Sequence, residues 1–328
     1  MSVSLELQPH LYDPKKIELA HIRDGFGHGL VKAADANDQI VALCADLTES
    51  TRMNYFQEKF PERYIEVGVA EQNLVTLASG MAAIGKIPFV ASYATFSPGR
   101  NWEQIRTTIC YNNRPVVIVG AHAGVSVGPD GATHQALEDI ALMRVLPNMT
   151  VIVPCDMHQA YQATIAAASY GKPAYLRLAR DKSPLITTEK TGFEIGKAQV
   201  LREGSDIVII SCGIVTHGAL IAAEQLEKKH KISVGVVNMH TIKPLDEQLI
   251  VAIAKQARFL VTVEEHQVRG GLGSAVSECV TSTRPMPVLR LGIRDRFGES
   301  GNPTELLKHF ELDADGIVAA VSQALTHV

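Results

Sequence analysis

A glutamate lies where two apolar segments of the sequence meet. In "YIEVGVAEQNLVTLASGMAAIG", residues 64–85, alternating apolar residues predict a strand that ends near Ala70, and an amphipathic helix follows directly. Glu71 lies between them. Burying an unpaired carboxylate is costly, so a buried glutamate is normally paired, neutral or functional. Glu71 is therefore a candidate for acid–base chemistry, and the plainer interpretation is a first-turn carboxylate that the helix dipole stabilises.

Other polar and aromatic residues follow neighbouring predicted strands. They are Asp46 and Ser50 after the first strand, Tyr93 and Phe96 after the third, His122, Asp130 and His134 after the fourth, and Arg180 after the sixth. In an open parallel sheet the carboxyl ends of the strands meet at one edge, where ligands bind. We therefore expect these side chains to gather at that edge.

Each of these candidates also has a purely structural interpretation. Tyr93 and Phe96 are also what an ordinary aromatic core contains. "GPDG", residues 128–131, is a common turn sequence, and His134 is also suited to capping the helix that follows. Arg23 and Arg180 are also compatible with solvated surface charges. It is the joint placement of the candidates, rather than any one of them, that favours a functional site.

Strand-length apolar runs alternate with helix-length amphipathic segments along the whole chain. In the first half we predict strands at 40–47, 64–69, 88–94, 116–121, 150–154 and 174–178, with helices at 72–84, 102–111, 135–145 and 157–169. In the second half we predict strands at 207–211, 234–238, 259–263 and 288–291, with helices at 216–229, 245–256, 273–281 and 316–325. This alternation predicts an α/β fold with parallel sheets covered on both faces.

A polar segment without periodicity, "ARDKSPLITTEKTGFEIG" at 179–196, separates the two halves. We predict the linker there, with one domain at 1–188 and a second at 189–328. "GGLG", residues 270–273, lacks the lysine of a phosphate-binding loop, and we interpret it as the turn into a helix. The neighbouring His266 has no cluster of metal ligands around it, which favours a structural role.

The composition argues against several classes of partner. The chain has 328 residues, 31 of them basic and 35 acidic, and its net charge of -4 disfavours nucleic acid and anionic membranes as partners. No apolar run approaches the ~20 residues that a membrane helix needs. The N-terminus has no signal-peptide pattern, and the five cysteines occur singly, so we expect buried free thiols and a cytoplasmic location.

Three stretches together resemble one known family. "YIEVGVAEQNLVTLASGMAAIG", "ASYATF" and "AHAGVSVGPDGATHQALEDIALMRVLPNMTVIVPCD" are similar to the pyrimidine-binding and C-terminal domains of transketolases, and deoxyxylulose-phosphate synthases share much of this pattern. The resemblance extends from about residue 19 to the C-terminal helix. It implies a parallel-sheet pyrimidine-binding fold for thiamine diphosphate, followed by a smaller α/β transketolase C-terminal domain.

The resemblance also implies a missing partner. Full-length transketolases carry an N-terminal domain whose GDG…N motif holds Mg2+ and the diphosphate, and this chain has no GDG. The chain therefore resembles the C-terminal subunit of a split transketolase. We expect a separate N-terminal subunit that supplies the metal site, no metal ligands from this chain, and homodimerisation of this chain within a heterotetramer.

The resemblance assigns cofactor roles to four residues. It implies that Glu71 hydrogen-bonds the aminopyrimidine ring of thiamine diphosphate and stabilises the tautomer that takes up a proton from the thiazolium carbon. A dry pocket suits a carboxyl group that shares its proton with the ring. Tyr93 and Phe96 would stack on the pyrimidine, and Asp46 would lie near the thiazolium ring. Many transketolases have a further aromatic residue where this chain has Gly99.

The remaining candidates match positions that bind the substrate in this family. Asp130 corresponds to a residue that binds the donor hydroxyl next to the carbonyl, and His134 is the second catalytic candidate, close to the oxygen that gains charge. The positions that hold the sugar phosphate are occupied by Arg23, Ser50, His122 and Arg180. Guanidinium, hydroxyl and imidazole groups suit a phosphate, and equally a sulfonate. The implied reaction transfers a two-carbon ketol unit from a ketose phosphate to an aldose phosphate.

Three other functions remain open. A deoxyxylulose-phosphate synthase-like subunit would share Glu71, Asp130 and His134. The beta subunit of a 2-oxo acid dehydrogenase has a similar length, but "GPDG" followed by "THQ" disfavours it. A non-catalytic, transketolase-like regulatory protein is the third. The donor and acceptor also remain open among pentose phosphates, a branched sugar phosphate and a sulfosugar.

Overall fold

The computed structural model describes residues 5–326, and its first half builds a seven-stranded sheet. Six parallel strands form most of it: β2 (Ile40–Cys44), β3 (Tyr64–Glu66), β4 (Ile87–Tyr93), β5 (Val117–Ala121), β6 (Thr150–Ile152) and β7 (Ala174–Arg177). Runs such as "IVALC" and "VIVGA" are buried at every position, as expected for strands covered on both faces. The sheet order is β12-β6-β7-β5-β4-β2-β3.

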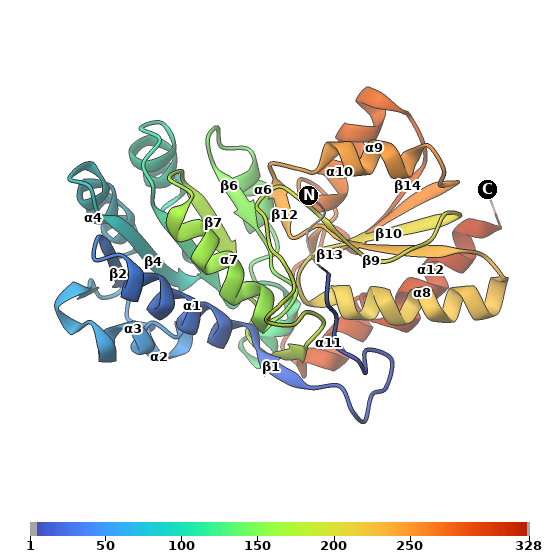
Figure 1. The fold of residues 1–328 in the computed structure, drawn as a ribbon, viewed down its shortest axis with the longest axis horizontal. Coiled ribbons are helices and arrows are strands. Elements are labelled where there is room, and N and C mark those ends of the chain that lie inside the picture. Colours follow the sequence, from blue (N-terminus) through green and yellow to red (C-terminus); the bar gives the residue numbers. More distant parts are fainter. Residues whose placement is uncertain (1–4, 327–328) are drawn as a thin grey trace.

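Helices cover both faces of this sheet (Figure 1). The helices and turns of the first half are α1 (Ile22–Ala36), α2 (Thr48–Thr51), α3 (Asn54–Lys59), α4 (Glu71–Ala83), α5 (Trp102–Gln104) with a π-helical turn at Ile105–Cys110, a 3-10 turn at Val125–Asp130, α6 (Asp139–Arg144) and α7 (Met157–Ser169). The helices α1 and α7 pack side by side on one face. Gly25 and Gly29 permit this contact, because a Cβ at either would overlap the backbone of α7.

The second half repeats the layered arrangement with a five-stranded sheet in the order β14-β13-β10-β11-β9. Its strands are β9 (Gln199–Arg202), β10 (Ile207–Ser211), β11 (Val234–Asn238), β13 (Phe259–Gln267) and β14 (Val288–Ile293), and β9 alone of these runs antiparallel. Its helices are α8 (Thr216–His230), α9 (Glu247–Ala254), α10 (Leu272–Thr283), α11 (Pro303–His309) and α12 (Ala314–Leu325). The predicted α/β architecture with parallel sheets is therefore confirmed.

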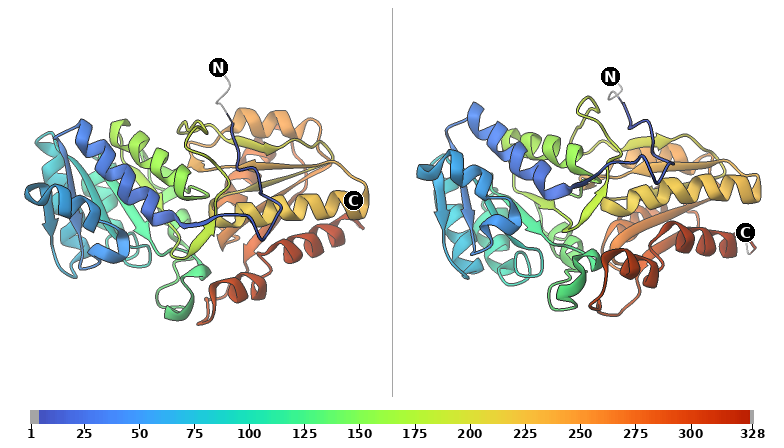
Figure 2. Two further views of the ribbon diagram at one scale, coloured as in Figure 1. Left: turned by 60° about the horizontal axis from the view of Figure 1, so that its bottom comes forward. Right: turned by 90° about the horizontal axis from the view of Figure 1, so that it is seen from below.

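Several features join the two halves. Strand β12 (Thr241–Lys243) comes from the second half but completes the edge of the first sheet, antiparallel to β6. One apolar cluster also runs between the sheets, and contains Ile118 and Val151 from the first with Ile210 from the second. A short antiparallel ribbon of β1 (Leu19–His21) and β8 (Lys182–Pro184) lies between the halves. The N-terminal segment runs alongside α8 (Figure 2), where the His217 ring nitrogen bonds the Leu11 carbonyl at 2.7 Å.

Differences from the predicted elements have physical causes. The predicted strand 64–69 ends at Glu66, because Gly68 adopts a left-handed φ of 69° and turns the chain toward α4. The predicted helix 135–145 is shorter, at Asp139–Arg144. The antiparallel strands β9 and β12 and the helix α1 were not predicted. All five cysteines are buried and free, as predicted. Among residues 5–326, the helices lack the combination of length and apolarity that crossing a bilayer requires.

Candidate functional site

Two of the candidates stand at strand ends in a strained backbone conformation. Asp46 follows β2 with a φ of 59°, and His122 follows β5 directly with a φ of 55°. Residues other than glycine rarely adopt positive φ, and such strain concentrates at ligand-binding sites. Both residues lie at the carboxyl edge of the parallel sheet, where the sequence placed them.

Two arginines are fixed next to this edge by backbone carbonyl groups. Arg23, in the first turn of α1, is only 7% exposed; its Nε and Nη2 donate to the carbonyl of Arg180 at 3.2 and 2.8 Å. Its Nη1 donates to the carbonyl of Ser50. Arg180 in turn donates from Nη1 to the carbonyl of Val127 at 2.6 Å. The fold therefore brings together Arg23, Ser50 and Arg180, three of the four residues expected to hold a phosphate.

The fourth, His122, lies in a cluster of rings. Its imidazole stacks on Tyr93 with 3.9 Å between ring centroids, and Tyr93 lies nearly parallel to Phe96 at 6.1 Å. His134 meets Phe96 edge-on at 5.5 Å. Loops after β4 and β5 thus place both aromatic candidates and both histidines in one group.

Positive charge predominates in this region, with Asp24 paired to Arg52 beside it. Burial, together with Arg23, Arg180, Arg52 and His134 in decreasing order, lowers the pKa of His122 from 6.5 to about 2. Burial and then Arg52 lower the pKa of Arg23 to about 10. His122 is therefore neutral at physiological pH, and its buried Nδ1 has no hydrogen-bond partner within the described residues. Such a group of cations is suited to binding an anion.

Glu71 begins α4 and is 6% exposed. Within residues 5–326 its carboxylate makes no hydrogen bond or ion pair, whereas its carbonyl accepts a bond from Asn101 Nδ2 at 2.9 Å. Asn101 also donates to Ser97 Oγ at 3.1 Å, and its own buried Oδ1 has no partner in that part of the chain. Asn101 thus connects the turn carrying Glu71 to the segment directly after Phe96.

Asp46 and Asp130 are the two exposed candidates. The amide of Asp46 donates to Glu66 Oε1 at 2.7 Å, and the same carboxylate accepts from the amide of Gly68 at 2.8 Å. Glu66 therefore ties the end of β2 to the turn that leads to Glu71. Asp130 ends the 3-10 turn before His134. Between residues 5 and 326, neither aspartate side chain makes a hydrogen bond or ion pair with another candidate.

Sequence reasoning missed Arg52, Glu66 and Asn101. Arg52 raises the positive charge at the site while pairing with Asp24 of α1. Each of the three acts through a residue more than 15 positions away, so no local spacing identifies it. One signal existed for Glu66, which is a carboxylate inside a strand pattern whose other face is apolar.

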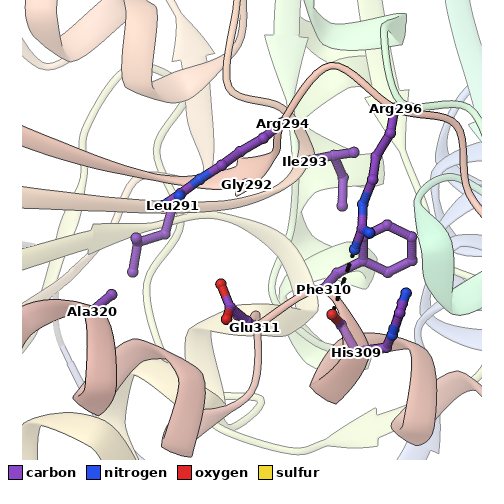
Figure 3. Close-up of a pocket in the computed structure, with 9 residues that line it drawn as sticks. All are labelled: Leu291, Gly292, Ile293, Arg294, Arg296, His309, Phe310, Glu311 and Ala320. Atoms are coloured by element: carbon purple, nitrogen blue, oxygen red, sulfur yellow. Dashed lines mark hydrogen bonds between the residues drawn. The ribbon is translucent and has the colours of Figure 1, made fainter.

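Across residues 5–326, no group of three or more His, Cys, Asp or Glu side chains is arranged to hold a metal ion. A separate cavity of about 380 Å3 lies in the second half of the chain, between β14 and the α11–α12 region (Figure 3). There the guanidinium of Arg296 lies 4.2 Å from the ring centroid of Phe310. None of the candidate residues lines this cavity.

Comparison with known proteins identifies the family. The family described as "Transketolase, pyrimidine binding domain" matches residues 19–184, and "Transketolase, C-terminal domain" matches residues 196–317. The chain belongs to the transketolase family. This confirms the resemblance read from the sequence, and the predicted division at 188/189 falls in the interval between the two matches.

Transketolase-family relatives differ in how much of their length this chain covers. It is 43% identical to a putative transketolase C-terminal section of Methanocaldococcus jannaschii, over 93% of this chain and 96% of that protein. It is 39% identical to a 6-deoxy-6-sulfo-D-fructose transketolase subunit of a Clostridium species, over 94% and 95%. By contrast it spans about half the length of longer relatives, for example 46% of a 1-deoxy-D-xylulose-5-phosphate synthase of Syntrophus aciditrophicus, at 40% identity.

A solved structure shares this fold. It is described as a split gene transketolase, an inactive beta4 tetramer, and is 45% identical, with a TM-score of 0.87 and coverage of 93% of this chain and 98% of that one. Transketolases depend on thiamine diphosphate, and the residues of this chain fit half of a site for it. Within the described part of the chain, the Glu71 carboxylate and a His122 ring nitrogen have no partner, and Tyr93 and Phe96 form a parallel aromatic pair; a nitrogen heterocycle and an anionic sugar would satisfy these groups.

Proposed function

We propose that this chain is the C-terminal subunit of a two-chain, thiamine-diphosphate-dependent transketolase that moves a two-carbon ketol unit from a ketose phosphate to an aldose phosphate. Two observations carry the proposal: a putative transketolase C-terminal section matches 93% of this chain, and the largely buried Glu71 side chain has no partner among residues 5–326. The first half of the chain would bind the pyrimidine end of the cofactor, with the domains divided at 188/189.

Four residues would hold the cofactor. Glu71 would keep a proton on a ring nitrogen of the aminopyrimidine, because its side chain is largely buried and its carboxylate has no competing partner among residues 5–326. Tyr93 and Phe96 would stack against the ring, which adds roughly 0.5–1.5 kcal/mol per aromatic contact. Asp46 would lie toward the thiazolium. When bound, thiamine diphosphate supplies the nucleophilic carbon and the electron sink that cleavage of a bond beside a ketone requires.

The substrate would enter over the ring cluster. Arg23, Ser50, His122 and Arg180 would hold the terminal anion, and the predominantly cationic surroundings of His122 support this role. His122 would donate one hydrogen bond as a neutral imidazole. His134 would hydrogen-bond the donor oxygen that gains negative charge, and Asp130 would accept a bond from the adjacent hydroxyl.

A second polypeptide would complete the enzyme. We propose an N-terminal transketolase subunit that holds Mg2+ and the diphosphate, and a heterotetramer in which this chain forms the homodimeric part. The name of the split-gene relative, an inactive tetramer of beta chains, supports a requirement for the other subunit. The five buried free cysteines support a reducing, cytoplasmic compartment.

Replacing Glu71 tests the proposal. In the complex with the N-terminal subunit, thiamine diphosphate and Mg2+, Glu71→Ala should reduce ketol transfer by at least about 100-fold, because proton transfer through the ring loses its support. Glu103→Ala is a matched control, since Glu103 is also a first-turn glutamate but is exposed. Equal activity of both variants, with unchanged circular dichroism, would refute the role of Glu71.

A panel of donors tests the substrate class. Ketose phosphates should support turnover with an aldose phosphate acceptor. Preference for a donor with a terminal sulfonate would place the chain with the sulfosugar relative, and condensation of pyruvate with an aldehyde would instead favour the synthase-like alternative. Mass spectrometry of the products distinguishes these three outcomes.

A further inference from the structure

The loop that carries Asp130 and His134 is fitted to the second half of the chain at each of its glycines. This substrate loop comprises residues 122–135. A Cβ at Gly124 would overlap the carboxyl group of Glu265, and one at Gly131 would approach the hydroxyl of Ser300. Gly128 faces Pro303, the first residue of α11, and all three glycines have positive φ. In Figure 2 the green turn and the red helix α11 lie next to each other.

Glu265 is the buried polar connection at the start of this loop. It lies on β13, is 3% exposed, and its carboxylate accepts a hydrogen bond from the amide of Ser126. Its carbonyl accepts a bond from Arg177 Nη2 at 2.8 Å, and Arg177 pairs with Asp139 at 2.7 Å. Glu265 is therefore bonded to the first half through both its side chain and its backbone.

The end of the loop is held in the same way. Gln135 Nε2 donates to the carbonyl of Glu299 at 2.8 Å and to that of Val125 at 3.0 Å. Gly298 passes so close to Gln135 that a Cβ would overlap its amide group. His134, directly before this anchor, has an exposed Thr133 as its hydrogen-bond partner.

We propose that Glu265 is a positioning residue that fixes the substrate loop and thereby sets affinity for the donor sugar without contacting it. The inference rests on the proposed function, since Asp130 and His134 are its substrate ligands. Three positive-φ glycines give this loop wide backbone freedom, so its shape depends on what it packs against. Among the described residues, Glu265 supplies the carboxylate that receives the Ser126 amide.

The neighbouring Glu264 offers a matched control. It is also fully buried on β13, but its carboxylate accepts from the amides of Leu272 and Gly273 at 2.7 and 2.8 Å. These bonds stay within the second half and hold the start of α10. Replacing Glu264 or Glu265 removes a buried acid from adjacent positions of β13, but only the replacement of Glu265 removes a contact with the substrate loop.

Hydrogen exchange on the full chain alone tests the positioning. In Glu265→Ala we expect the amides of residues 125–131 to exchange about tenfold faster or more, because the Ser126 amide loses its acceptor. Glu265→Gln should stay near wild type, since its Oε1 can still accept the bond. Glu264→Ala should affect residues 271–274 instead. Unchanged exchange in the loop of Glu265→Ala, or equal acceleration of the loop in Glu264→Ala, would overturn the proposal.

Kinetics of the complex with the N-terminal subunit provide the second readout. Glu265→Ala should raise the KM for the donor about tenfold or more, with thiamine diphosphate affinity within about twofold of wild type and recovery in Glu265→Gln. If Glu265→Ala does not fold, Gly124→Ala disturbs the same contact from the loop side. An unchanged donor KM despite faster loop exchange overturns the proposal. A wild-type complex without ketol transfer refutes the proposed function, while the exchange experiment still decides the positioning.

Discussion

Arg23, Arg180 and His122 lie close together at the proposed anion site, and Asp24, which pairs with Arg52, offsets part of the positive charge there. Burial first, and then repulsion from neighbouring cations, lowers the pKa values of Arg23 and His122, so an arriving dianion would relieve an existing cost. The arginines need no large rearrangement, because backbone carbonyls already hold both guanidiniums. The affinity of the site for a phosphorylated or sulfonated sugar would come from this prearranged charge.

Inorganic phosphate should therefore stabilise the chain even without its partner. At a saturating concentration we expect the Tm to rise by about 2–4 °C, because the ligand binds the folded state alone. Arg180→Gln should abolish the rise, while Arg100→Gln, which replaces an exposed arginine, should keep it. Differential scanning fluorimetry at matched ionic strength measures the effect. A rise that persists in Arg180→Gln would contradict the assignment.

His122 should also shape the acid side of the stability profile. Its pKa in the folded state is about 2 against 6.5 normally, so below pH 6.5 the unfolded chain binds a proton that the folded chain does not. This contribution to stability is complete above pH 6.5 and is lost as the pH falls. Between pH 6.5 and 5, wild type should lose about 1–2 kcal/mol more than His122→Gln.

Urea unfolding at several pH values measures this difference. The comparison with His122→Gln is needed because the buried His240, whose pKa burial lowers to about 3, contributes a slope of the same sign in both proteins. Parallel curves for wild type and variant would show that His122 is not held neutral in the folded state.

At the scale of elements, Asp156 connects a helix to the linker. It caps α7 by accepting the Gln159 amide at 2.8 Å, and its other oxygen accepts the amides of Ile186 and Thr187 at 2.7 and 2.6 Å. The side chain is fully buried. One carboxylate thus fixes both the start of α7 and the path of the chain between the two sheets.

Asp156→Ala should lower the free energy of unfolding by about 3 kcal/mol or more, because a cap and several buried charge-assisted bonds are lost together. Asp313→Ala is the comparison, since Asp313 caps α12 with one bond, to the Gly316 amide at 2.9 Å. That variant should lose only about 1 kcal/mol. Urea denaturation measures both, and equal losses would contradict the bridging role of Asp156.

The elements that the sequence predicted well are those whose signal is local. Strands 207–211 and 234–238 have the predicted bounds, because continuous apolar runs describe a strand buried on both faces. Helix α1 escaped prediction because Gly25, Gly27 and Gly29 interrupt its apolar pattern. Gly25 and Gly29 are needed for contact with α7, which lies 100 or more positions later in the chain. A local sequence window does not contain both partners of this contact.

The candidate site shows the same difference between local sequence signals and contacts made across the fold. The rule that ligands gather at the carboxyl ends of parallel strands located the ring cluster of Tyr93, Phe96, His122 and His134. It could not find Asn101 or Glu265, because their importance lies in contacts made across the fold. The sequence therefore predicted the residues that could bind a ligand, but it did not predict residues such as Asn101 and Glu265 that hold them in place.

For the whole molecule, the two sheets share one apolar cluster and one strand exchange. The apolar cluster that joins them and the insertion of β12 into the first sheet mean that neither half is complete alone. We expect one unfolding transition in calorimetry, with a ratio of van't Hoff to calorimetric enthalpy of about 1. A fragment of residues 1–188, which lacks β12, should not give a cooperative transition. Two separated transitions in the full chain would contradict this expectation.

The close fit between the substrate loop and residues 298–303 also restricts how such genes can be recombined. A hybrid that joins two distant homologues at the linker would combine the substrate loop of one parent with residues 298–303 of the other. Any parent with a bulkier residue opposite Gly128 or Gly131 would spoil the match. Lineages should therefore inherit these two segments as a pair, and paired replacements should mark their divergence.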